Sequence, residues 1–368
     1  MNIPTIKHAQ MEQMLNVSYS TKTPLMFHGT FGIGKSWGVR EWAKAEAKRL
    51  GLIFSDTAEH INNEKYFVCI VMALHQFDAA GFNLPVFSDG EYSLLMNSLF
   101  PVKGQGIIFF DEINLAPPLV QANAYQILLD RKLNQYIVPE KYGICAAGNT
   151  IEDNAHITSM ATPLKNRMLH VGLGVPSAQD WVNDFAIPFG IDHRINSFLL
   201  FSSQYIYKYD VDANEDEYAI PTPRSWEFVS RIIKGQEDFD QLELLTSSAV
   251  GVGVAREFVA HLRLSRAIKI ADVFKKKTVV VPKEASDLYA LISAILGYFD
   301  QHRDPKTKAV QPEIVSTLAE LVLLFKAEHA VLLLKQAVGL DAALFTTLKS
   351  TNPKAFKELA AKYVKLLV

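Results

Sequence analysis

The stretch "PLMFHGTFGIGKSWGVREWAKAEAKRL", residues 24–50, joins a short apolar run, a glycine-rich loop and a helix-forming segment. Residues 29–36 fit the pattern G-x-x-x-x-G-K-[ST], whose glycines let backbone N–H groups point inward around phosphate groups. In such a loop the lysine, here Lys35, reaches the β and γ phosphates, and the hydroxyl of Ser36 binds Mg²⁺. The helix that follows adds the positive end of its dipole. The predicted nucleotide-binding residues are Gly29, Thr30, Phe31, Gly32, Ile33, Gly34, Lys35, Ser36 and Trp37.

A second motif predicts that the nucleotide is hydrolysed as well as bound. The stretch "GIIFFDEIN", residues 106–114, is an apolar run that ends in two adjacent carboxylates. Asp111 would hold Mg²⁺ through its water, and Glu112 would polarise the water that attacks the γ-phosphate.

Three further polar residues stand at the ends of expected strands and helices. Asn149 follows the apolar run "GICAAG" and could orient the attacking water with its neutral amide. Arg167 precedes the next strand, and Arg224 begins a helix after two prolines. Each alone would ordinarily be a turn or surface residue. A phosphate site gives them a chemical role, because transition-state charge on the γ-phosphate needs guanidinium donors.

The first half of the chain alternates apolar runs with helix-period segments, which is typical of a parallel sheet covered by helices. The predicted fold is therefore α/β with a parallel five-stranded sheet. Strands are expected near 24–28, 66–73, 106–110, 143–147 and 168–173, and helices at 8–18, 35–50, 117–131 and 159–166. After residue 175 helical patterns dominate. They predict two helical domains, 176–269 and 270–368, behind the nucleotide-binding domain 1–175.

The composition and charge of the chain bear on which classes of protein it can belong to. Of 368 residues, 49% are hydrophobic, and the net charge of −2 makes no case for a chain-wide nucleic-acid or membrane surface, although a local nucleic-acid site stays open. Cys69 and Cys145 lie in apolar runs and are expected to be core thiols. No apolar run is long enough to cross a membrane, and the start has no secretory signal, so a cytoplasmic location is expected.

The order of these motifs resembles that of the AAA+ ATPases, and within them the MoxR-like group. The stretch "DEINLAPPLVQ", residues 111–121, has the form D-E-I-N-x-A-x-x-x-x-Q that is typical of that group. The resemblance implies an AAA+ core with a helical lid from residue 176, and a short β-hairpin at "NQYIVPEKY". It also implies that Asn149 is sensor 1, Arg167 the arginine finger and Arg224 sensor 2. Thr30 and Phe31 depart from the small or proline residues usual in the group.

The same resemblance implies how the protein works. It predicts ATP and Mg²⁺ as cofactors, a homo-oligomeric, hexameric ring, and remodelling or chaperoning of a protein partner, for which a protein with a von Willebrand factor A domain is a candidate. Two alternatives stay open from the residues: a nucleic-acid motor or loader, and a nucleotide-dependent switch with little turnover. Residues 270–368 match no motif of the group and are predicted to form a helical bundle.

Overall fold

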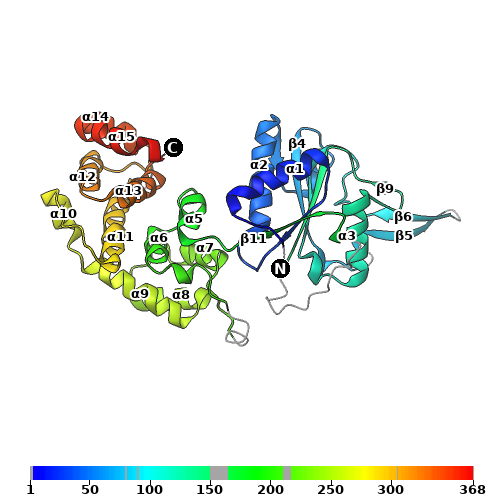
Figure 1. The fold of residues 1–368 in the computed structure, drawn as a ribbon, viewed down its shortest axis with the longest axis horizontal. Helices are drawn as coiled ribbons and strands as arrows, with labels where there is room; N and C mark the ends of the chain where they lie inside the picture. Colours follow the sequence, from blue (N-terminus) through cyan, green and yellow to red (C-terminus); the bar gives the residue numbers. More distant parts are fainter. Residues whose placement is uncertain are drawn as a thin grey trace. The chain divides into compact units, whose positions relative to one another are not determined.

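The computed structural model divides into two compact units, Met1–Val175 and Pro176–Val368 (Figure 1). The first unit is α/β and the second is helical, so the division falls where the strand patterns of the sequence end. The residues that the structure describes are 3–78, 81–88, 91–149, 165–209, 217–304 and 306–367.

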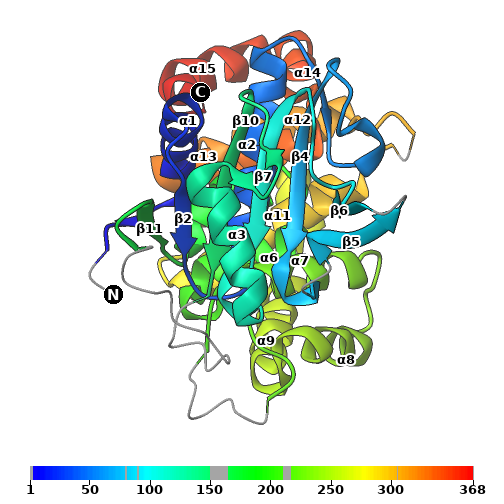
Figure 2. The ribbon, with the colours of Figure 1, turned by 90° about the vertical axis from the view of Figure 1, so that its right-hand side faces the viewer.

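A parallel sheet forms the centre of the first unit (Figure 2), in the order β1-β11-β2-β10-β7-β4-β3. The sheet is parallel as predicted, and its five central strands are the predicted ones. It has seven strands instead of five, because two short strands extend its edges. The strands are β1 (Thr5–Ile6), β2 (Leu25–His28), β3 (Ile53–Ser55), β4 (Tyr66–Ala73), β7 (Gln105–Asp111), β10 (Tyr142–Gly148) and β11 (Leu169–Leu173).

Helices cover both faces of this sheet. On one face, the Trp42 ring lies 5.4 Å from the Tyr19 ring and 6.0 Å from the Phe67 ring. On the other face, Ile108 and Phe110 belong to an apolar cluster with the long helix that follows β7. The helices on the first face are α1 (Met11–Thr21) and α2 (Lys35–Arg49), and the helix on the second face is α3 (Pro118–Asp130). The helix predicted at 159–166 lies mostly outside the described residues.

Two antiparallel hairpins are attached to the first unit. Strands β5 (Asn83–Ser88) and β6 (Glu91–Met96) pair between β4 and β7 in the sequence and project away from the large sheet (Figure 1). Strands β8 (Lys132–Leu133) and β9 (Tyr136–Ile137) form a shorter hairpin before β10. The hairpin predicted at "NQYIVPEKY", residues 134–142, is shifted toward the N-terminus in the structure: only the second strand of the shorter hairpin lies in that segment.

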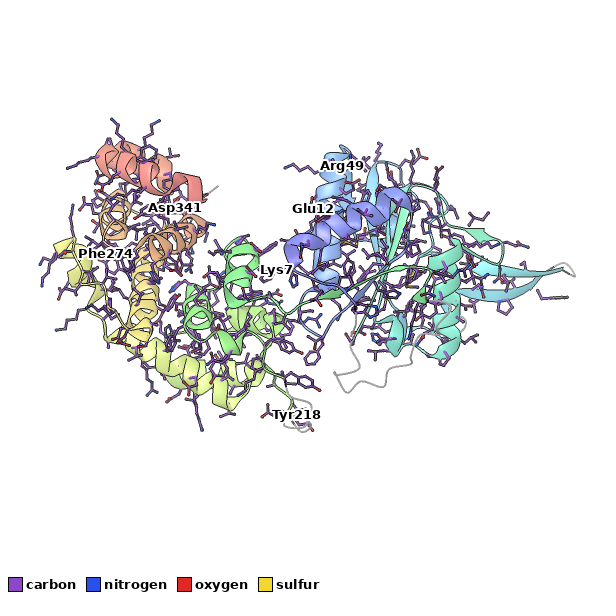
Figure 3. The ribbon with its side chains drawn as sticks, in the orientation of Figure 1. Lys7, Glu12, Arg49, Tyr218, Phe274 and Asp341 are labelled. Atoms are coloured by element: carbon purple, nitrogen blue, oxygen red, sulfur yellow. The ribbon has the colours of Figure 1, made fainter. Side chains whose placement is uncertain are left out.

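The second unit has one apolar core that reaches from Ala178 to Tyr363. At the boundary predicted near residue 270, the Phe274 ring (Figure 3) stacks on the Tyr298 ring at 4.4 Å. The structure therefore groups the two predicted helical segments into one compact unit. Its helices are α5 (Ala178–Trp181), α6 (His193–Phe201), α7 (Pro223–Ile232), α8 (Phe239–Val250), α9 (Val252–Ala267), α10 (Ile270–Lys276), α11 (Ala285–Gln301), α12 (Pro312–Val322), α13 (Ala327–Leu340), α14 (Leu344–Thr351) and α15 (Pro353–Leu367).

Among the described residues, no single helix combines the length and apolar composition needed to cross a membrane. Helices α13 and α14 meet that test only as a pair, and the pair is bent by 106° at its break.

Candidate active site

The glycine-rich loop connects β2 to α2 and follows a course that depends on glycine. Gly32 and Gly34 have φ angles of 70° and 100°, in the left-handed region that side chains rarely adopt. A Cβ atom on Gly29 would lie only 2.9 Å from the carbonyl oxygen of Leu173. Gly29 and Gly34 are the two glycines of the pattern, and the close approach at Gly29 and the positive φ of Gly34 explain why glycine is required there.

The remaining loop residues lie within the same turn. Ile33 is buried, whereas Thr30, Phe31 and Trp37 are half-buried. His8, in the 3₁₀ turn η1 (His8–Gln10), holds the loop from outside, since its Nε2 lies 2.6 Å from the carbonyl oxygen of Ile33. No motif indicated this contact, because His8 comes before the loop-forming pattern.

Lys35 points its ammonium group into the loop. Its Nζ donates to the carbonyl oxygens of Gly29 at 2.6 Å and Thr30 at 2.9 Å, and to Oδ1 of Asn149 at 2.9 Å. The residue is only 8% exposed. These three acceptors are uncharged oxygens, and phosphate oxygens bind an ammonium group more strongly. The arrangement fits a phosphate at the loop.

The two predicted magnesium ligands are in direct contact. Ser36 Oγ donates a hydrogen bond to Oδ2 of Asp111, and the other oxygen of Asp111 accepts from the Glu112 backbone N–H at 3.0 Å. Within the described ranges, no three His, Cys, Asp or Glu residues gather as a metal site. Magnesium is commonly held by one or two carboxylates together with substrate phosphates, so this oxygen pair fits the ion.

Glu112 adopts an unusual backbone conformation at the end of β7. Its φ of 53° lies in the left-handed region, which costs a non-glycine residue about 1–3 kcal/mol. Its Oε2 lies 2.6 Å from Nδ1 of His75, in the 3₁₀ turn η3 (Leu74–Gln76) after β4. No sequence motif indicated His75. The available signal was its place directly after a strand, because Ala73 pairs with Asp111 and the two strand ends therefore meet.

Asn149 lies beside the loop, as its contact with Lys35 shows. Its backbone is held by Asn114, a second residue that no sequence motif indicated. Lys35, Ser36, Asp111, Glu112 and Asn149 therefore gather at the carboxyl ends of β2, β7 and β10, where ligands bind in open parallel sheets.

Arg167 is outside this cluster. It precedes β11, is 57% exposed, and its Nη2 lies 3.6 Å from Oδ1 of Asp130. Leu169 pairs with Leu25, so Arg167 lies beyond the amino end of β2, and the glycine-rich loop follows the other end. The length of β2, about 13 Å, therefore separates Arg167 from the glycine-rich loop.

Two other arginines have different environments. Arg131 donates to the carbonyl oxygens of Pro139 at 3.0 Å and Tyr142 at 2.8 Å, so it holds the segment that leads from the short hairpin into β10. Arg224 is exposed in the first turn of α7, whose start is capped by Thr222. It belongs to the second unit, and its role at the nucleotide stays a prediction.

A histidine pair lies at the base of the loop. His170 Nε2 lies 2.7 Å from the carbonyl oxygen of Lys165, which can only accept, so His170 Nδ1 accepts from His28 Nε2 at 2.9 Å. The pKa of His28 is lowered to about 4, chiefly by burial and additionally by the His170 ring and the Lys35 and Lys165 ammonium groups. His28 is therefore neutral at pH 7.

This shift predicts a loss of stability in mild acid. Because the folded pKa lies below the ordinary value of about 6.5, the unfolded chain binds more protons as the pH falls from 6.5 toward 4. Between pH 7 and pH 5 the His28 contribution to the free energy of unfolding should fall by about 2 kcal/mol. His28→Gln keeps an N–H donor for His170 and should lose correspondingly less in chemical denaturation. Equal losses in both proteins would contradict the prediction.

Comparison with known proteins gives distant structural similarity only. No family model matches the chain, and no curated protein matches it. A mutant of RuvB from Thermotoga maritima is 12% identical, with 82% of this chain and 77% of that chain covered and a TM-score of 0.34. NtrX from Brucella abortus in complex with ADP is 14% identical (80% and 63% covered, TM-score 0.36), and ORC2 from Aeropyrum pernix is 10% identical (96% and 84% covered, TM-score 0.34). At this level of similarity, functional assignment depends on the site residues.

Proposed function

We propose that this protein is an AAA+ ATPase that binds ATP and Mg²⁺ at the glycine-rich loop and hydrolyses the nucleotide. The observation that supports this most directly is the contact set of three motifs that are far apart in the sequence. Lys35 contacts Asn149, and Ser36 contacts Asp111. An ordinary glycine-rich turn is not expected to bring a buried lysine, a hydroxyl–carboxylate pair and a neutral amide together.

The proposed roles follow from the chemistry of each side chain. Lys35 binds the β and γ phosphates, and Ser36 and Asp111 hold the magnesium site, where the ion would neutralise phosphate charge. Glu112 accepts the proton of the attacking water. Asn149 orients that water or the γ-phosphate with its amide.

The test is phosphate release by the purified full chain with ATP and Mg²⁺, compared with the same sample in excess EDTA. Metal-dependent turnover supports the proposal. ATP binding without turnover would instead support a nucleotide-dependent switch, and stimulation by DNA would support a nucleic-acid motor or loader.

We further propose a MoxR-like hexameric ring that remodels or chaperones a protein partner, with a von Willebrand factor A domain protein as the first candidate. In this ring, Arg167 acts on the nucleotide of a neighbouring subunit, and Arg224 contacts nucleotide as sensor 2 from the lid. The position of Arg167 beyond the amino end of β2 supports action in trans, because its own loop lies at the opposite strand ends.

Arg167→Ala is expected to bind ATP normally and to hydrolyse it at least about tenfold more slowly, because a charge-stabilising guanidinium is lost. Turnover and equilibrium ATP binding are measured on the same preparation. Arg40→Ala is the matched control, since Arg40 is also an exposed, ion-paired arginine of the first unit. Normal turnover in Arg167→Ala would exclude it as the finger.

Mixing variants tests action in trans. In rings formed from Arg167→Ala and Glu112→Gln subunits, some interfaces would combine an intact Glu112 with an intact Arg167 from the next chain. Turnover should partly return. Mixed rings verified by mass spectrometry that stay as inactive as both parents would remove the support for trans action.

A further inference from the structure

The side-chain amide of Asn114 forms two hydrogen bonds with the backbone of Asn149. Asn114 lies in the 3₁₀ turn η5 (Ile113–Leu115), directly after Glu112, and is 9% exposed. Its Nδ2 donates to the Asn149 carbonyl oxygen at 2.8 Å, and its Oδ1 accepts from the Asn149 N–H at 3.1 Å. One amide therefore satisfies both backbone groups of Asn149, across 35 residues of sequence.

A glycine beside Asn149 allows Asn114 to approach closely enough for these hydrogen bonds. A Cβ atom on Gly148 would lie 2.8 Å from Oδ1 of Asn114 and 2.8 Å from Cε of Met26, so only glycine allows the approach. On the other side, buried Gln121 donates from Nε2 to the carbonyl oxygen of Ala116 at 2.9 Å. Gln121 thus holds the residue that follows the turn η5.

The two hydrogen bonds from Asn114 fix the Asn149 backbone and, with it, the position of the Asn149 side chain. Asn149 Oδ1 accepts from Lys35, and the Gly148 carbonyl oxygen accepts from the Gly29 N–H at 3.3 Å. The end of β10 is therefore held by the glycine-rich loop on one side and by Asn114 on the other. Asn114 connects the segment of Asp111 and Glu112 to the segment of Asn149.

We propose that Asn114 is a positioning residue for ATP hydrolysis, which acts by holding Asn149 in register with Lys35. This inference rests on the proposed ATPase function. A residue with only a structural role would lower thermal stability, and would lower affinity for all nucleotides together. A positioning residue that acts through Asn149 affects turnover and the discrimination of ATP from ADP, because only ATP has a γ-phosphate.

A double-mutant cycle tests the inference, with kcat, ADP affinity and ATP affinity measured for Asn114→Ala, Asn149→Ala and the double variant. We expect each single variant to lose about tenfold to hundredfold in kcat, since small misplacements of catalytic groups have effects of this size. ADP affinity should change less than about threefold. The double variant should lose no more than Asn149→Ala alone, because Asn114 has nothing left to position.

Two further variants keep the test decisive if Asn114→Ala folds poorly. Asn114→Asp retains the acceptor for the Asn149 N–H but faces the carbonyl oxygen with a second acceptor, so kcat should fall by about as much as in Asn114→Ala. Gly148→Ala displaces Asn114 without removing a polar group and should also lower kcat. Thr347→Ala, in the second unit, is a control for general effects of substitution.

The outcomes separate the two proposals. If the wild-type chain hydrolyses ATP and the losses of the two single variants multiply in the double variant, Asn114 does not act through Asn149 and the inference fails. A parallel loss of ADP affinity and kcat would also overturn it, in favour of a structural role. If the wild-type chain shows no turnover, the proposed function itself fails.

Discussion

Lys35→Ala is expected to abolish measurable ATP binding, with a loss of about a hundredfold or more in affinity. Each hydrogen bond from a charged donor is worth about 1.5–3 kcal/mol, and in the proposed complex the lysine would face two phosphates. The apolar strands that form the core are untouched, and the ammonium donates to the loop carbonyls and to Asn149. The variant should therefore fold.

Equilibrium binding of labelled ATP gives the readout, and circular dichroism verifies the fold. Lys48→Ala is a suitable control, because Lys48 is an exposed lysine of the same helix, α2. A folded Lys35→Ala protein that binds ATP with wild-type affinity would show that the loop does not hold the phosphates.

The central strands could be predicted from the sequence because each is a buried run with clear ends. In β7, every residue from Gly106 to Phe110 is buried. The edge strands β1 and β3 have only two or three residues, and Ile53 in β3 is 57% exposed. They form because β11 and β4 offer a free edge, which is a tertiary effect that no local pattern records.

In the helical unit, local sequence patterns likewise do not predict which elements pack together. Amphipathic segments indicate that one face of each helix is buried, but they do not indicate which helix covers it. The predicted boundary near residue 270 assumed separate cores for the two segments. In the structure α11 packs on both α6 and α9, so both segments share one core.

In the candidate site, too, some residues could be predicted from the sequence and others could not. Lys35, Ser36 and Asp111 belong to motifs of fixed spacing, and their contacts follow from the fold of a parallel sheet. His75 and Asn114 were missed because each acts on a residue in another segment. The left-handed conformation of Glu112 also has no local signal, since glutamate has no preference for it.

Glu112→Gln is the second change with a large expected effect. The amide keeps the shape and hydrogen-bonding capacity of the carboxylate but cannot accept the proton of the attacking water. Turnover should fall by about a hundredfold or more, and ATP should still bind. The contact with His75 Nδ1 survives through the amide oxygen, so the local structure should be retained.

Single-turnover measurements separate the chemical step from nucleotide binding in this variant. Glu64→Gln, an exposed glutamate before β4, is the control and should hydrolyse ATP normally. In the proposed ring, retained ATP should also make the assembly more stable, because a nucleotide that bridges neighbouring subunits would favour assembly by mass action. Sedimentation of Glu112→Gln with and without ATP measures this effect. Near-normal turnover in Glu112→Gln would assign the base to another residue, and His75, whose Nδ1 lies 2.6 Å from the Glu112 carboxylate, would be the next residue to replace.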